Sequence, residues 1–334
     1  MAVRIGINGF GRIGMLVARA AMQVADEDIQ IMAVNDTRPR QSLAFFRRDS
    51  VHGMWPEEVS IDDSILRIGE REIKTFSERE PANIPWGDVG VDIVVESTGV
   101  FTDREGAAGH LEGGAKKVVI SAPGKGVDAT LIYRVNHESY DPQNHHVVSN
   151  ASCTTNCIIP MVKVLQENFG IESGYMTTCH AYTNDQTLID AAHKDPRRAR
   201  AAAQNIIPTS TGAARTAGVI FPELEGKVDG MAFRVPVVDG SITDFVAQVN
   251  RETSIEEIND AFKEAAEGEL KDILEYTDDP LVSTDIIGNP ASCIFDSQLT
   301  MSNGKTVKVF GWYDNEWGYS CRTVDLARYI GEHL

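Results

Sequence analysis

The sequence predicts a two-domain α/β protein, in which a doubly wound parallel sheet is followed by an α+β domain with a mostly antiparallel sheet. Three observations support this fold class. The chain has 334 residues, which is enough for two domains that each bury a core. Its first half alternates short apolar runs with helical stretches, a pattern typical of a parallel sheet that helices cover on both faces. Its second half contains longer stretches of alternating polar and apolar residues, as expected for antiparallel strands.

The first half begins with a predicted strand, helix and strand. Residues 3–7 form a short apolar run, and residues 13–24 then place apolar side chains at helical spacing. The apolar run at residues 29–34 is the second strand. Three more apolar runs predict strands at residues 91–95, 118–120 and 147–148. Each of these ends in small polar residues, which we expect to line a site because ligands bind beyond the carboxyl ends of strands in such sheets.

The second half begins with a helix predicted at residues 153–167, in which Pro160 should cause a kink or cost a hydrogen bond. Ser254 and Glu257 form a capping box that opens a further helix of about fourteen residues, and an amphipathic helix closes the chain. Alternating residues predict strands at residues 174–182, 231–236, 242–250 and 307–312.

The composition excludes some classes of partner. With 31 basic and 49 acidic side chains, the net charge of −18 argues against nucleic acid and anionic membranes as partners. No apolar run approaches the ~18 residues of a membrane span, and the chain opens on an apolar strand rather than a secretion signal. We therefore expect a cytoplasmic protein whose five cysteines are reduced thiols. The acidic excess fits either simple solubility or a salt-rich cytoplasm.

Gly9, Gly11 and Gly14 have the G-x-G-x-x-G spacing of a Rossmann-type dinucleotide-binding turn, between a predicted strand and helix. The first glycine allows a tight turn, the second lets a pyrophosphate approach the backbone, and the third permits close helix–strand packing. The helix start offers N–H groups to the phosphates. Asp36, just beyond the second strand, can accept hydrogen bonds from the adenosine ribose. The alternative is three turn glycines and a solvated aspartate.

Cys153 lies at a predicted strand-to-helix junction, where unpaired N–H groups and the helix dipole favour a thiolate nucleophile. Cys157, one turn further along the helix, is expected to be a buried and inert thiol. The Cys-x3-Cys spacing has no partner pair at metal-ligand distance in the sequence, so we expect no metal site.

A thiol nucleophile needs a base, and His180 is the candidate because it lies on a predicted strand of the second half. Alternation places His180 and Cys179 on opposite faces, so only one of the two can face a site. A single histidine in a strand is also a common structural residue. From spacing alone, the pairing of Cys153 with His180 is therefore a hypothesis.

Seven segments spread over nearly the whole chain carry longer motifs. They are Asn8-Gly-Phe-Gly-Arg-Ile-Gly14, Ser149-Asn-Ala-Ser-Cys-Thr-Thr-Asn-Cys157, His180-Ala-Tyr-Thr183, Arg197-Arg-Ala-Arg-Ala-Ala-Ala203, Asn205-Ile-Ile-Pro-Thr-Ser-Thr-Gly-Ala-Ala214, Phe233-Arg-Val-Pro236 and Trp312-Tyr-Asp-Asn-Glu-Trp-Gly-Tyr-Ser320. In this order the set resembles the phosphorylating glyceraldehyde-3-phosphate dehydrogenases, and the nonamer around Cys153 is highly specific by itself.

The resemblance implies a reaction of glycolysis or gluconeogenesis. D-glyceraldehyde 3-phosphate, inorganic phosphate and NAD or NADP would give 1,3-bisphosphoglycerate and the reduced cofactor. Cys153 would attack the aldehyde to form a hemithioacetal, with His180 as the base, and oxidation would leave a thioester that phosphate cleaves.

The resemblance also assigns binding residues. Those for the substrate phosphate are Thr183, Asp185 and Arg234, and those around the nucleophile and the attacking phosphate are Ser152, Thr154, Thr211 and Gly212. Cofactor contacts are assigned to Gly9, Gly11, Arg12, Ile13, Gly14, Asp36, Thr37, Ser97, Thr98, Ser121, Ala192 and Asn315. Of these, Asn315 would hold the nicotinamide carboxamide.

The resemblance further implies a domain plan and an assembly. We expect a dinucleotide-binding domain at residues 1–150, a catalytic domain at residues 151–316, and a C-terminal helix at residues 317–334 that packs back on the first domain. The basic segment at residues 194–200 would reach a neighbour's adenine pocket, so we expect a homotetramer. Without the resemblance, the same segment would be interpreted as a solvated surface.

The chain departs from the family pattern at a few positions. Thr37 after Asp36, and Ala192 where strictly NAD-dependent members carry proline, are typical of members that accept NADP, although Asp36 would still repel a 2′-phosphate. We therefore expect both cofactors to be used. The turn after Pro236 reads Val-Val-Asp-Gly rather than the commoner Thr-Pro-Asn-Val, and Met15 replaces an arginine.

Two other functions share some of these sequence features. Erythrose-4-phosphate dehydrogenases share the nucleotide motif and the thiol, but the intact segments at residues 180–183 and 208–212 favour the three-carbon substrate. A non-catalytic nucleotide-binding regulatory protein would be expected to lack the nucleophile or the base, and both are present.

Overall fold

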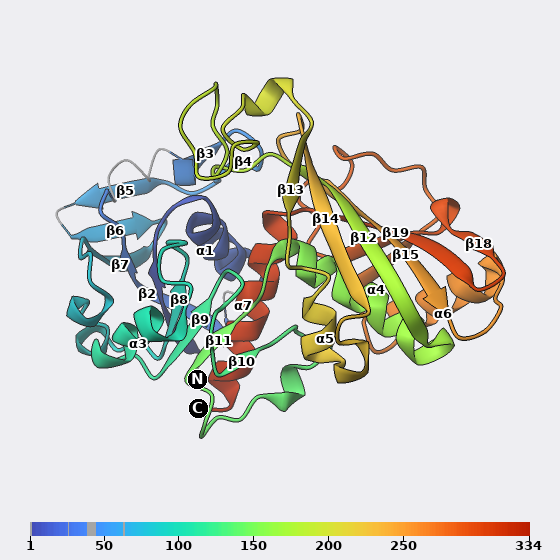
Figure 1. Cartoon of the computed structure of the whole chain (residues 1–334). Coiled ribbons are helices and arrows are strands. Elements are labelled where there is room, and N and C mark those ends of the chain that lie inside the picture. The colour runs from blue at the N-terminus through green and yellow to red at the C-terminus, as the bar shows by residue number, and fades with distance from the viewer. Residues whose placement is uncertain (1, 26, 39–44, 63) are drawn as a thin grey trace. The chain divides into compact units, whose positions relative to one another are not determined.

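The computed structural model describes residues 2–25, 27–38, 45–62 and 64–334. The chain divides into two compact units (Figure 1). The N-terminal unit comprises Met1–Ser152 and Ser320–Leu334, and the central unit comprises Cys153–Tyr319.

Among the described residues of the N-terminal unit, nine strands form one sheet in the order β10-β11-β9-β8-β1-β2-β7-β6-β5. The pairs from β10 to β7 are parallel, and the last two pairs are antiparallel. The strands are β1 (Val3–Asn8), β2 (Ile29–Asn35), β5 (Val59–Asp62), β6 (Ile65–Ile68), β7 (Arg71–Phe76), β8 (Ile93–Glu96), β9 (Lys117–Ile120), β10 (Ala129–Thr130) and β11 (Val147–Ser149). The five predicted strands are confirmed with small shifts in their bounds. Strands β5–β7 were not predicted, because charged residues interrupt their short apolar runs.

The turn from β1 into helix α1 (Arg12–Val24) is tight. Gly9 has a φ of +87°, and a Cβ on Gly14 would lie 2.0 Å from the carbonyl oxygen of Gly9. A side chain at either position is therefore excluded. Helix α3 (Arg104–Glu112) and the part of α7 (Trp317–Glu332) from Ser320 onward also belong to this unit. A Cβ on Gly331 of α7 would lie 2.3 Å from the Val3 side chain, so this helix packs closely on β1.

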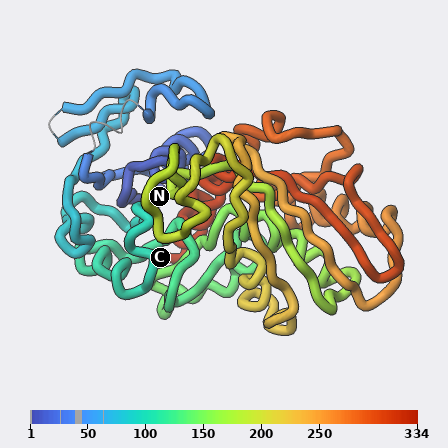
Figure 2. Tube along the Cα trace, turned by 45° about the horizontal axis from the view of Figure 1, so that its top comes forward, coloured from blue at the N-terminus to red at the C-terminus, as the bar shows by residue number. Residues whose placement is uncertain are grey.

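The central unit contains a mixed sheet in the order β13-β14-β12-β15-β19-β17-β16, with β18 also paired to β19. Its long strands run side by side in Figure 2. The strands are β12 (Ile171–Ala181), β13 (Ile207–Ser210), β14 (Val228–Val235), β15 (Ser241–Val249), β16 (Leu274–Thr277), β17 (Cys293–Asp296), β18 (Met301–Asn303) and β19 (Thr306–Tyr313). Most pairs are antiparallel, as predicted, while β12–β14 and β16–β17 are parallel.

Helix α4 (Cys153–Phe169) packs against β15, β17 and β19, with α6 (Ile255–Glu267) beside it and the short α5 (Thr216–Ile220) near its other flank (Figure 1). The helix runs through Pro160 without a break, so the proline does not divide it. The predicted capping box of α6 is present at Ser254 and Glu257. Among the described residues, none of the helices has both the length and the apolar character needed to cross a membrane.

Candidate active site

The structure brings Cys153 and His180 together in the central unit. Cys153 is the first residue of α4, and His180 lies near the end of β12. The alternation of β12 buries His180 and exposes Cys179, so the histidine is the one that faces inward. The distance from Cys153 Sγ to His180 Nε2 is 3.4 Å, which is within hydrogen-bond reach for a sulfur atom.

The backbone around His180 determines which ring nitrogen carries the proton. Nδ1 lies 2.7 Å from the carbonyl oxygen of Ala181. Because a carbonyl oxygen can only accept, Nδ1 carries the hydrogen and the lone pair of Nε2 faces the sulfur. The ring is therefore held in the tautomer that can take a proton from Cys153.

Burial and one nearby cation set the protonation states of this pair. Burial, followed by the charge of Arg234, lowers the pKa of His180 to about 3. Burial raises the pKa of Cys153 to about 11, against the opposing effects of Arg234 and of hydrogen bonds with Thr154 at the helix start. At neutral pH the proton therefore rests on sulfur and the imidazole is neutral, as a general base requires.

Arg234 belongs to a cluster of polar side chains around the end of β12. Its Nη1 donates to Thr183 Oγ1 at 2.6 Å and to the Ala181 carbonyl oxygen at 3.2 Å. The Thr183 hydroxyl donates in turn to Asp185, and Arg198 Nη1 donates to the same carboxylate at 2.5 Å. Arg198 Nε also lies 3.5 Å from Asp195 Oδ2, so its charge is shared between two carboxylates. The donors that suit this cluster to a phosphate are therefore the Arg234 guanidinium and the Thr183 hydroxyl beside it.

The carboxylate in this cluster is ionised. Burial acts to raise the pKa of Asp185, but the hydrogen bond from Thr183 and the charges of Arg234 and Arg198 outweigh burial and hold that pKa below its ordinary value.

The Thr154 side chain bonds to other side chains of the central unit. Its hydroxyl lies 2.9 Å from the Tyr313 hydroxyl, which lies 2.9 Å from that of Thr178. The Thr154 side chain is thus engaged in the core, and what it can offer an anion is its backbone N–H at the helix start. Thr211 accepts from Ala213 N at 3.2 Å, and a Cβ on Gly212 would meet nothing within 4 Å, so the backbone at residue 212 is open to a ligand.

Asn315 is oriented by a serine from the neighbouring strand. Ser241 Oγ donates to Asn315 Oδ1 at 2.6 Å and accepts from Ala181 N at 3.1 Å. The amide oxygen of Asn315 is therefore occupied, and its Nδ2 hydrogens are the groups that it can present to a ligand. Ala192, also in the central unit, is exposed, and Ser152 is half-buried directly before α4.

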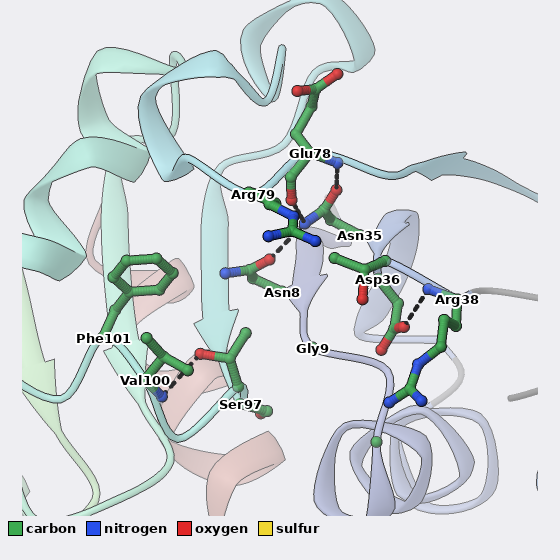
Figure 3. A pocket seen from close by; sticks show the side chains of 13 residues that line it. Asn8, Gly9, Asn35, Asp36, Arg38, Glu78, Arg79, Ser97, Val100 and Phe101 are labelled. Atoms are coloured by element: carbon green, nitrogen blue, oxygen red, sulfur yellow. Dashed lines mark hydrogen bonds between the residues drawn. The ribbon is translucent and has the colours of Figure 1, made fainter.

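A cavity of about 550 Å³ lies in the N-terminal unit at the carboxyl ends of β1, β2 and β8 (Figure 3). Six of the predicted cofactor residues line it, namely Gly9, Gly11, Asp36, Thr37, Ser97 and Thr98. A Cβ on Gly11 would meet nothing within 4 Å, so its backbone is open to a phosphate. Asp36 accepts from Phe10 N at 3.0 Å and from Arg38 N at 2.7 Å, which fixes its carboxylate at the cavity wall.

Other predicted cofactor residues lie beside this cavity. Ser121 Oγ donates to the Glu96 carbonyl oxygen at 3.1 Å and lies 3.0 Å from Ser97 Oγ. Arg12 forms an ion pair with Asp49, and Ile13 follows it in the first turn of α1. The glycine turn, the open helix start and the fixed carboxylate fit an adenine dinucleotide.

Comparison with known proteins gives the same result for both units. The family model of the glyceraldehyde 3-phosphate dehydrogenase NAD binding domain matches residues 3–104, and that of the C-terminal domain matches residues 152–315. The glyceraldehyde-3-phosphate dehydrogenase of Streptomyces coelicolor is 56% identical over the full length of both chains. The chain belongs to the glyceraldehyde-3-phosphate dehydrogenase family. Further relatives are those of Geobacillus stearothermophilus, 56% identical over 99% of this chain and 98% of its own, and glyceraldehyde-3-phosphate dehydrogenase 1 of Bacillus subtilis, 54% identical over 99% of both.

In this member of the glyceraldehyde-3-phosphate dehydrogenase family, some residues that orient the predicted ones were not themselves predicted from the sequence. Ser241, Tyr313 and Arg198 each contact a predicted site residue. Tyr313 and Arg198 lie inside the motifs at residues 312–320 and 197–203, so their position in these motifs could have identified them. Ser241 lies in no quoted motif, and only the pairing of β15 with β12 and β19 reveals its place. The cavity lining also includes Asn8, Asn35, Arg38, Glu78, Arg79, Val100 and Phe101.

Proposed function

We propose that this protein is an NAD-dependent phosphorylating dehydrogenase that converts D-glyceraldehyde 3-phosphate and inorganic phosphate to 1,3-bisphosphoglycerate. The observation that carries this proposal is the 3.4 Å approach of Cys153 Sγ to the unprotonated Nε2 of His180. A thiol with an adjacent base, beside an Arg234–Thr183 pair suited to a phosphate, has the groups that this reaction requires.

The reaction begins when Cys153 adds to the aldehyde carbon and forms a hemithioacetal. His180 accepts the proton that the hemithioacetal hydroxyl loses during oxidation. Bound NAD supplies the acceptor for the hydride that leaves the same carbon. The product on the enzyme is a thioester of Cys153. An oxygen of inorganic phosphate then attacks the thioester carbonyl, and the C–S bond breaks to release the acyl phosphate and the thiol.

The two anions have separate sites in this proposal. Thr183 and Arg234 bind the phosphate that the aldehyde already carries, with Asp185 and Arg198 orienting them. The open backbone at Gly212 and the N–H groups at the start of α4 bind the attacking phosphate. The same helix start stabilises negative charge on the oxygen of the tetrahedral intermediate.

NAD binds with its adenosine half in the cavity of the N-terminal unit, where Asp36 accepts from the ribose hydroxyls and the Gly9–Gly11 turn faces the pyrophosphate. NADP is a second cofactor in this proposal. Thr37 is exposed, and Arg38 and Arg79 line the same cavity as Asp36 (Figure 3), so two cations can offset the repulsion between Asp36 and a 2′-phosphate. We expect measurable turnover with NADP, and a kcat/KM below about a thousandth of that for NAD, roughly 4 kcal/mol, would contradict this part of the proposal.

The proposal includes a cytoplasmic homotetramer. Leu188, Ile189 and Ile206 are between 68% and 81% exposed in the central unit, and such apolar exposure favours an interface between copies. Light scattering on the purified protein measures the assembly, and cell fractionation measures the location.

One experiment tests the central reaction. Oxidation of D-glyceraldehyde 3-phosphate is followed by absorbance of the reduced cofactor, with and without phosphate, for the parent and for Cys153→Ser. We expect phosphate-dependent turnover in the parent and a loss of at least about 1000-fold in the variant. Equal activity in the two proteins, or none in either, would overturn the assignment.

A further inference from the structure

Behind the wall of the nucleotide cavity lies a buried carboxylate that several donors share. Glu96 ends strand β8 and is 2% exposed. Its Oε2 accepts from Asn8 Nδ2 at 2.5 Å and lies 3.0 Å from His110 Nε2. Its Oε1 accepts from the backbone N–H of Thr98 at 2.7 Å and from the Thr98 hydroxyl. Each oxygen thus meets two donors, so the hydrogen-bonding capacity of this buried carboxyl group is used.

A tryptophan behind His110 fixes where the histidine proton lies. Trp86 Nε1 lies 3.0 Å from His110 Nδ1, and both side chains are fully buried. Since an indole nitrogen only donates, Nδ1 must be the acceptor and Nε2 must carry the hydrogen. His110 therefore donates to Glu96, and the directions of the two hydrogen bonds that connect Trp86, His110 and Glu96 are fixed.

Glu96 connects separate segments of the cavity wall. Asn8 and Thr98, which it binds, both line the cavity. Asn8 Oδ1 accepts from Asn35 Nδ2 at 2.7 Å, and Asn35 Oδ1 accepts from Glu78 N at 2.8 Å (Figure 3). The Glu96 carboxylate therefore joins the ends of β1 and β8 directly, and Asn8 and Asn35 extend this network to the end of β2 and the segment after β7. The turn at Gly9 lies against Thr98, because a Cβ there would be 2.7 Å from Thr98 N.

We propose that Glu96 is a positioning residue for the dinucleotide, which holds the cavity wall in its binding geometry before the ligand arrives, with His110 and Trp86 fixing the direction of every hydrogen bond. The proposal rests on the placement of the adenosine half of NAD in this cavity. A mobile cavity wall loses conformational entropy when the ligand binds, and a preformed wall avoids this cost. Loss of the preformed geometry should therefore weaken the affinity for NAD more than it lowers turnover.

The substitution Glu96→Gln tests this role because it changes one acceptor atom into an NH2 group. In either orientation of the amide, that group faces an N–H donor, on Asn8 and His110 or on Thr98, and donors cannot bond one another. We expect the Kd for NAD, measured by calorimetry, to rise at least tenfold. At saturating NAD we expect kcat, and the KM for the aldehyde, to change less than about threefold.

Asp92→Asn is the matched control. Asp92 directly precedes β8, at the strand end opposite Glu96, and its carboxylate accepts from Arg4 Nε at 2.9 Å and from Lys116 Nζ at 2.8 Å. This variant loses a well-bonded carboxylate away from the cavity, so thermal stability falls while the Kd for NAD stays within about twofold of the parent value. Glu96→Gln with the same Kd as Asp92→Asn would overturn the proposal.

A second substitution tests the proton directions. Trp86→Phe removes the indole N–H, so His110 can carry its proton on Nδ1 and accept at Nε2 from the new amide. We expect the Kd for NAD of the double variant Trp86→Phe/Glu96→Gln to rise by less than the product of the fold-increases in the two single variants. A fold-increase in the double variant that equals or exceeds this product would overturn the role of Trp86 and His110.

Three further variants cover the remaining outcomes. If Glu96→Gln does not fold, His110→Gln and His110→Leu replace it, since glutamine can accept from Trp86 and donate to Glu96 whereas leucine cannot. We then expect only His110→Leu to raise the Kd, and equal Kd values would overturn the proposal. Asp36→Ala tests the placement of the dinucleotide itself, so an unchanged Kd in that variant shows that the placement, rather than the role of Glu96, is wrong.

Discussion

At Cys153, burial and one neighbouring base act on the same proton. Burial raises the pKa of the thiol to about 11, which by itself would leave very little thiolate at neutral pH. His180, with its Nε2 lone pair 3.4 Å from the sulfur, offers the proton a second location that does not require transfer to solvent. The reactivity of the thiol at neutral pH therefore depends on the imidazole.

We predict that His180→Asn slows alkylation of Cys153 by iodoacetamide at pH 7 at least tenfold. Without the base, the thiol loses its proton only to solvent, and a raised thiol pKa means that the thiolate fraction keeps increasing with pH. The alkylation rate should therefore rise about tenfold per pH unit through pH 9. Stopped-flow or mass-spectrometric alkylation in a Cys179→Ser background, which removes an exposed competing thiol, measures it. Identical pH profiles with and without His180 would rule out its role as base.

The same residues show which features of the site can be predicted from the sequence alone. Alternation along one strand correctly separated His180, which is buried, from Cys179, which is exposed. It could not reveal that the Thr154 hydroxyl is bound to Tyr313, because that contact joins residues 159 positions apart. Sequence therefore predicted which residue types gather at the site, whereas their hydrogen-bond partners depended on strand pairing.

At the scale of elements, periodicity predicted the long helices and the buried parallel strands, and it failed where an element lacks a clear apolar pattern. Strands β5–β7 are half-polar and were missed. The parallel pairing of β12 with β14 could not be predicted, because alternation indicates a strand with one solvated face but not the direction of the neighbouring strand. The turn between β14 and β15, noted in the sequence as unusual, contains a buried carboxyl group whose environment only the fold explains.

That carboxyl belongs to Asp239, which is fully buried near Asp314 at the end of β19, with carboxylate oxygens within 4.8 Å of one another. Asp314 accepts from the backbone N–H groups of Glu316, Trp317 and Gly288, at 2.9, 2.7 and 2.7 Å. Burial, followed by the charges of Asp314 and Glu316, raises the pKa of Asp239 to about 9. At neutral pH, Asp239 is therefore protonated in the folded protein.

We predict that Asp239→Asn stabilises the protein increasingly as pH rises. An unfolded aspartate has a pKa near 3.9, so between about pH 4 and pH 9 the folded state binds more protons than the unfolded state, and the stability of the parent falls as pH rises. Asparagine can donate to Asp314 without a proton to lose. The gain in unfolding free energy should grow by up to ~1.4 kcal/mol per pH unit. Thermal unfolding at pH 5, 7 and 8.5 measures it, and a Tm difference independent of pH would refute it.

At the scale of the whole molecule, the dominant feature is a net charge of −18 on a protein whose proposed substrates are themselves anions. The local cluster of Arg234 and Arg198 attracts phosphate over a few ångströms, while the surrounding surface repels it over a longer range. Salt screens the long-range repulsion first, because exposed charges lose their mutual interaction beyond one Debye length, whereas partly buried groups are screened much less.

We therefore predict that the KM values for D-glyceraldehyde 3-phosphate and for inorganic phosphate fall as NaCl rises from about 0.01 M to about 0.15 M, where the Debye length shrinks from about 30 Å to about 8 Å. Initial rates at saturating NAD measure both constants. Glyceraldehyde without its phosphate serves as the control, since an uncharged substrate feels no such repulsion and its KM should stay constant. A KM for the phosphates that climbs steadily from the lowest salt would show that the arginine cluster, rather than the net charge, governs the approach of the substrate.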